Sequence, residues 1–129
     1  MKQNKDTVDD NIRKSIYEYL EVLKLEQGSE TFNSDMNSCL DEIETQLISL
    51  PEFENEYHYE KQKVEIELSN DRERAKQHAS QTDEDIAYDM VYGKEMGKAA
   101  YKFYLGIGRI LVRLGTKHGI FKRMNPEQK

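Results

Sequence analysis

The sequence predicts an all-α protein: a bundle of about four helices forming a single domain over residues 1–129. Apolar residues recur at spacings of four and three along most of the chain, which is the pattern of one helix face. The chain has only 2 prolines, and 36% of its residues are hydrophobic, so a core requires most of the chain to wrap it as amphipathic helices. Its 129 residues are enough for one domain. We expect short flexible ends over about residues 1–7 and 120–129.

The first two helices are expected over about residues 8–26 and 35–49. Gly28 suits the left-handed conformation that often ends a helix, and Ser34 suits an N-cap. Pro51 disfavours continuation of the second helix past residue 50. In both segments the apolar positions step by four, three and four: Ile12, Ile16, Tyr19 and Leu23, then Met36, Leu40, Ile43 and Leu47.

The third segment, about residues 52–79, permits two interpretations. Its apolar residues follow a helical seam with interruptions, and its polar residues are good helix formers. However, residues 64–68 also alternate apolar and polar side chains, as a half-buried strand would. We favour a helix, with residues 69–71 as the expected place for a break. The alternative is a three-helix core with a small strand element at 64–68.

The last helix, about residues 83–115, has the most regular pattern. We expect Thr82 to cap it and Gly115 to end it. Nine small or apolar positions follow an unbroken repeat of four and three, within an arc of about 120°: Ile86, Met90, Gly93, Gly97, Ala100, Tyr104, Ile107, Leu111 and Leu114.

Acidic side chains are concentrated in the first part of the chain. Residues 1–93 carry a net charge of −13, and residues 25–60 contain 10 carboxylates but no Lys or Arg. One interpretation is a solvated face that the basic C-terminal helix partly neutralises. The other is a surface that docks on a basic groove of another protein in place of nucleic-acid phosphates. The candidate docking residues are Asp41, Glu42, Glu44, Glu52, Glu54, Glu56 and Glu60.

The last helix carries a basic stripe opposite its apolar face. Residues 94–129 have a net charge of +7, and six of the cations fall within about 140° of helix surface. Such a stripe can contact phosphates, or it can pair with the acidic helices. The candidate nucleic-acid-binding residues are Lys94, Lys98, Lys102, Arg109, Arg113 and Lys117.

Small residues on the apolar face of the same helix predict close helix–helix approach, either within the bundle or across a homodimer interface. Gly106 and Gly108 lower helix stability by about 1 kcal/mol each relative to Ala. They therefore indicate a kink or a point where a partner backbone comes near. The candidate packing or dimer residues are Gly93, Gly97, Ala100, Tyr104, Ile107 and Leu111.

The sequence contains no strong catalytic or metal-binding pattern. None of the 3 histidines follows a Glu by three residues, as the di-metal helical bundles require. Glu54 and His58 lie four apart and form only a weak two-ligand possibility. Cys39 lies beside an apolar seam and is expected to act as a small hydrophobe. We therefore predict no cofactor, no metal and no enzymatic activity.

The leading hypothesis is a small non-catalytic protein-interaction module or regulator. One concrete version is a phage or mobile-element inhibitor of a nucleic-acid-handling protein. The alternatives are a nucleic-acid-binding protein that uses the basic stripe and a carboxylate-rich metal-dependent helical enzyme. The polar N-terminus, the single cysteine and the absence of a long apolar run favour a cytoplasmic protein that does not bind membranes, in a host cytoplasm if phage-encoded.

Overall fold

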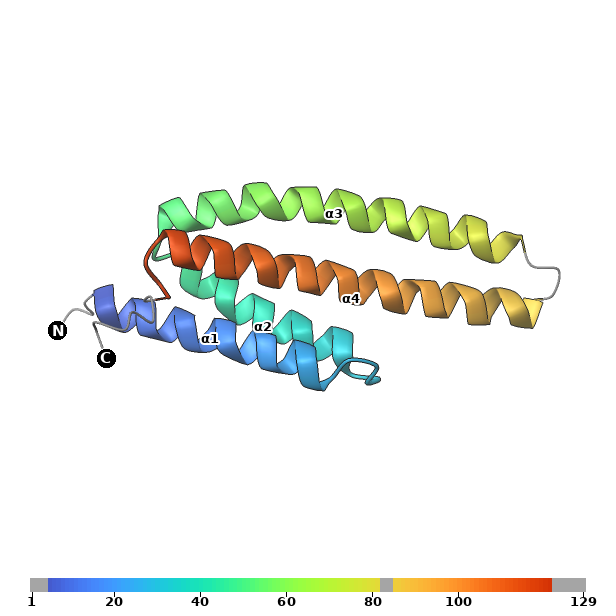
Figure 1. Ribbon diagram of the computed structural model, residues 1–129, viewed down its shortest axis with the longest axis horizontal. Helices are drawn as coiled ribbons and strands as arrows, with labels where there is room; N and C mark the ends of the chain where they lie inside the picture. Colours follow the sequence, from blue (N-terminus) through green and yellow to red (C-terminus); the bar gives the residue numbers. More distant parts are fainter. Residues whose placement is uncertain (1–4, 82–84, 122–129) are drawn as a thin grey trace, which may run out of the picture.

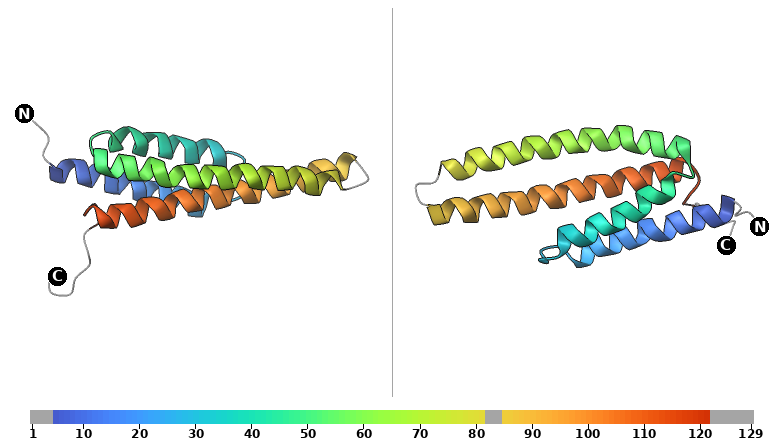
Figure 2. Two further views of the ribbon diagram at one scale, coloured as in Figure 1. Left: turned by 90° about the horizontal axis from the view of Figure 1, so that it is seen from above. Right: turned by 180° about the vertical axis from the view of Figure 1, so that it is seen from behind.

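The computed structural model describes residues 5–81 and 85–121, which form four α-helices (Figure 1). The helices are α1 (Lys5–Leu25), α2 (Phe32–Leu47), α3 (Pro51–Ser80) and α4 (Asp85–Lys117). This confirms the predicted all-α bundle. The hairpins α1–α2 and α3–α4 form two layers, and at one end α3 and α4 extend well beyond α1 and α2 (Figures 1 and 2). One end of the bundle therefore has two layers and the other has one.

The predicted seams form the core where the two layers overlap. All four seam residues of α1 and all four of α2 are buried, and they pack with Phe53 and Tyr57 of α3 and with the C-terminal half of α4. Two tyrosines connect the layers. The Tyr19 hydroxyl donates to the carbonyl of Tyr104 over 2.6 Å, and the Tyr104 hydroxyl donates to Asn37 Oδ1 over 2.6 Å.

Several helix ends differ from the prediction. Thr31, not Ser34, precedes the first residue of α2. Gly28 has the expected left-handed φ of 87°, and Pro51 is the first residue of α3, where its missing N–H is harmless. Gly115 does not end α4, which continues to Lys117, and the left-handed residue after it is Gly119, with φ of 81°. The predicted cap at Thr82 lies outside the described residues.

The strand alternative and the break in the third segment are both wrong, because α3 is continuous through residues 64–71. Val64 and Leu68 are half-buried and Ile66 is 63% exposed. The alternation therefore reflects a weakly buried helix face. The described structure also extends into both ends that the sequence predicted to be flexible. Residues 5–7 belong to α1, and Ile120 is fully buried.

Gly106 and Gly108 mark close approaches of side chains from neighbouring helices, whereas the prediction was the approach of a partner backbone. A Cβ atom at Gly106 would lie 3.3 Å from Val64 Cγ1 of α3. A Cβ atom at Gly108 would lie 3.2 Å from Leu20 Cδ2 and 3.4 Å from Tyr19 Cε1 of α1. The two glycines thus let α4 approach helices on two sides.

Candidate protein-interaction surface

Half of the basic stripe pairs with acidic residues of α3. Lys102 Nζ lies 3.4 Å from Asp71 Oδ2 and 3.6 Å from Glu67 Oε2. Further along α4, Arg113 Nη2 lies 3.4 Å from Glu60 Oε1. Lys117 contacts Glu56, which His118 also contacts. The cations Lys94, Lys98 and Arg109 are exposed and form no ion pair within the part of the chain that the structure describes.

Four of the seven predicted acidic residues have partners inside the molecule. Glu44 accepts hydrogen bonds from the Tyr57 hydroxyl and from Lys61 Nζ, each over 2.6 Å. Burial opposes ionisation of Glu44, but these two donors outweigh it and the pKa of Glu44 lies below its usual range. Glu56 and Glu60 hold the α4 cations, and hydrogen bonds from Lys117 and His118 lower the pKa of Glu56. Glu54 lies 3.8 Å from His58.

The other three, Asp41, Glu42 and Glu52, are exposed and have no ion pair among the described residues. Asp41 and Glu42 lie on α2, and Glu52 lies in the first turn of α3. The structure thus divides the predicted acidic set. Part of it neutralises α4, as the first interpretation expected, and part of it is left facing solvent.

Glu42 belongs to a cluster of carboxylates that the sequence analysis did not single out. Glu18, Glu26, Asp35 and Glu42 lie near Cys39, between α1 and α2. After burial, which is the larger cause, their negative charges raise the pKa of the Cys39 thiol. We call Glu18, Glu26, Asp35 and Glu42 the acidic cluster. None of the four forms an ion pair with a described residue.

The pattern in the sequence could have revealed part of this cluster. Ser15 and Gln46 each immediately precede a core residue, and Gln46 Nε2 donates to Ser15 Oγ over 2.9 Å. These two positions, each just before a core residue, therefore face each other between α1 and α2. Glu18, Asp35 and Glu42 occupy such positions.

Two carboxyl groups of the acidic cluster are close to each other. Thr31 Oγ1 lies 3.2 Å from Glu26 Oε1 and 2.9 Å from Asp35 Oδ2. Hydrogen bonding to Asp35 raises the pKa of Glu26, and the same contact, together with that from Thr31, lowers the pKa of Asp35. Opposite shifts of this kind are the behaviour of two carboxyl groups that interact with each other.

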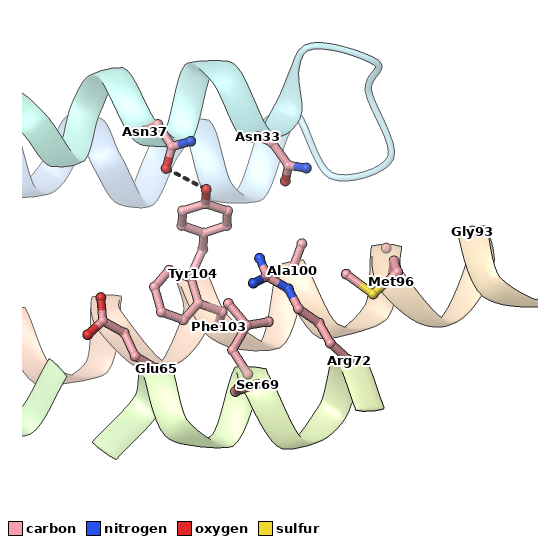
Figure 3. A pocket seen from close by; sticks show the side chains of 12 residues that line it. Asn33, Asn37, Glu65, Ser69, Arg72, Gly93, Met96, Ala100, Phe103 and Tyr104 are labelled. Carbon is pink, nitrogen blue, oxygen red and sulfur yellow. Dashed lines mark hydrogen bonds between the residues drawn. The ribbon is translucent and has the colours of Figure 1, made fainter. Parts of the chain in front are cut away.

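A groove of about 670 Å³ lies where α4 leaves the cover of α2 (Figure 3). Residues of α4 form its middle, Asn33 and Asn37 come from α2 on one side, and Arg72 comes from α3 on the other (Figure 3). A second groove of about 450 Å³, beside the α1–α2 connection, shares Gly97 and Ala100 with the first.

Gly93 and Gly97 are exposed, and a Cβ atom at either position would have no neighbour within 4 Å. The predicted close approach at these two glycines is therefore wrong for packing within the chain, because α1 and α2 are too short to reach them. Ala100 is half-buried, and Tyr104, Ile107 and Leu111 are buried in the core, as a packing role requires.

Among the described residues, no three His, Cys, Asp or Glu side chains are arranged to hold a metal ion. None of the helices, as far as they are described, is long and apolar enough to span a membrane. Comparison with protein-family models, curated proteins and solved structures finds no match. The surface itself therefore provides the basis for a functional proposal.

Proposed function

We propose that this protein is a small non-catalytic interaction module that docks the acidic surface of its α1–α2 hairpin on a basic surface of another protein. The observation that carries this proposal is the acidic cluster. Its four carboxylates all raise the pKa of the Cys39 thiol, and none has an ion pair among the described residues, whereas other carboxylates of the bundle are neutralised by α4. A cationic partner would relieve this repulsion.

The partner is defined by its chemistry: a protein with a basic groove or patch, such as one that binds nucleic-acid phosphates. Covering that patch would prevent nucleic-acid phosphates from binding to it. The protein would therefore act as a regulator or inhibitor in the cytoplasm. The rival function, direct binding of nucleic acid, is left with only three exposed stripe cations that have no described ion pair: Lys94, Lys98 and Arg109. Few phosphate contacts give weak, strongly salt-dependent binding.

The test compares two charge-matched variants. A partner captured from lysate is purified, and its association rate is measured by surface plasmon resonance. We expect Glu18→Gln with Glu42→Gln to slow association roughly 3- to 10-fold, because complementary charges mainly steer encounter. The control, Glu65→Gln with Glu73→Gln, removes the same charge from exposed sites on α3 and should leave the rate within about twofold.

Equal effects of the two double variants would contradict a localised acidic docking surface. So would a partner that binds normally to the acidic variant but is lost when Lys94, Lys98 and Arg109 are replaced by Gln. If the loss of binding in the Lys94/Lys98/Arg109 variant is accompanied by retention of the parent protein on DNA at low salt, nucleic-acid binding becomes the better-supported function.

We also propose that the chain forms a homodimer through the uncovered half of α4. Gly93 and Gly97 leave a smooth exposed strip there, and Met90 is 70% exposed. A second copy has the same uncovered stretch of α3 and α4. If the two copies pack antiparallel, each could cover the stretch of the other that α1 and α2 do not reach. Sedimentation equilibrium at micromolar concentration should give twice the 15.2 kDa chain mass. A single species at the chain mass would remove this proposal.

A further inference from the structure

At one end of the bundle, α1 and α3 begin and α4 ends (Figure 1). A cavity of about 430 Å³ lies there. It is separate from the grooves beside Gly97 and from the acidic cluster. Its lining comes from three parts of the chain: Asp9 of α1, the start of α3 with the residue before it, and the residue after α4. The lining residues are Asp9, Leu50, Pro51, Glu52, Phe53 and His118.

Asp9 is the unusual member of this lining. The residue is only 9% exposed, and its Oδ1 atom is buried with no hydrogen-bond partner among the described residues. Buried carboxylates are ordinarily paired or hydrogen-bonded, because the interior replaces water poorly as a partner for the charge. Because Asp9 also lines the cavity, a ligand bound there could supply the donor that its carboxylate lacks.

The charges around the cavity favour a cationic donor. Glu52 is exposed in the same lining, so an anionic ligand would meet two carboxylates. The start of α3 attracts negative charge, but Glu52 and Glu54 already supply it in the first turn. His118 is already occupied, since its ring contacts Glu56 and stacks on Phe53 with the ring centroids 5.4 Å apart.

The other walls suit the stem of a long side chain. Leu50, Pro51 and Phe53 give the cavity an apolar side, against which methylene groups can pack while a charged head reaches the carboxylate. Lysine and arginine have this form, with several methylene groups and a cationic head that only donates hydrogen bonds.

We propose that this cavity binds a lysine or arginine side chain of the partner protein, with Asp9 as the acceptor of its cationic head and Glu52 at its rim. The inference rests on the proposed docking to a basic protein and gives that interaction an anchoring site. It also makes Asp9 a binding residue whose burial is unfavourable in the free protein and is compensated in the complex.

The test is an NMR titration of the full ¹⁵N-labelled chain with n-butylammonium chloride, and separately with ethylguanidinium chloride, at constant ionic strength. Either cation should produce saturable shifts at the Phe53 amide and the His118 ring, with a dissociation constant on the order of millimolar for so few atoms. Asp9→Asn should abolish the saturable shifts, and Glu52→Gln, at an exposed position, should weaken them several-fold. The matched control Glu73→Gln, at an exposed position on α3, should leave them unchanged.

Asp9→Asn should also melt at the parent temperature or several degrees above it, because it removes a buried charge that lacks a partner. Linear shifts without saturation, equal shifts with uncharged n-butanol, or unchanged binding to Asp9→Asn would each overturn the proposal. These outcomes are independent of the docking surface. If the cations do not bind the cavity but the Glu18/Glu42 variant associates slowly, the anchoring site is wrong and the docking surface stands. If the cations bind but the Glu18/Glu42 variant associates at the parent rate, the docking surface is wrong and the cavity site stands.

Discussion

Gly108→Leu should destabilise the protein by about 1–3 kcal/mol. A Cβ atom at this position would already lie 3.2 Å from Leu20 and 3.4 Å from the Tyr19 ring, before the rest of a leucine side chain is added. Tyr19 is fully buried and its hydroxyl is bonded to the Tyr104 carbonyl, so the ring cannot move aside without losing that hydrogen bond. The gain in helix propensity, roughly 1 kcal/mol, should not offset the overpacking.

Gly97→Leu is the matched control, since it makes the same change in the same helix. No atom lies within 4 Å of a Cβ at this position. At concentrations where the chain is monomeric, the variant should therefore keep the parent stability or gain up to about 1 kcal/mol from helix propensity. Urea denaturation followed by circular dichroism measures both variants. Equal destabilisation of the two would mean that a second layer covers Gly97, as the proposed homodimer would provide, and the difference would then depend on protein concentration.

Ile107→Ala should cost about 2–5 kcal/mol, the largest effect we expect from a single truncation. Ile107 is fully buried in the core between Gly106 and Gly108. Those neighbours have no side chains that could fill the cavity, and the helices they contact are already close to α4. The surrounding residues can therefore do little to fill the cavity. We expect the loss in the free energy of unfolding to lie in the upper part of the range of about 2–5 kcal/mol.

The control for this truncation is Ile66→Ala, which removes the same atoms from a side chain that is 63% exposed on α3. Its effect should stay within about 0.5 kcal/mol. Chemical denaturation at pH 7 provides both free energies. An Ile66→Ala loss as large as that of Ile107→Ala would show that the outer face of α3 is covered by another chain.

The sequence by itself determined the helices and most of the core. A seam that steps by four and three, such as Ile12, Ile16, Tyr19 and Leu23, has one low-energy solution: a helix with that face buried. Such patterns depend only on neighbours along the chain, and all four residues are indeed buried. Pro51 and Gly28 act just as locally, through backbone geometry, and both have the expected roles.

Only the tertiary structure decided which faces have partners. Gly93 and Gly97 continue the same seam as Ile107, yet they are exposed, because the α1–α2 layer ends before it reaches them. Likewise, the sequence could not separate Glu60, paired with Arg113 over 3.4 Å, from Glu42, which has no ion pair among the described residues. The cavity beside Asp9 gave no signal in the sequence, since its other lining residues, near the start of α3 and just after α4, are distant along the chain. Periodicity reports the burial tendency of a face, whereas pairing and cavities depend on how far the other helices extend.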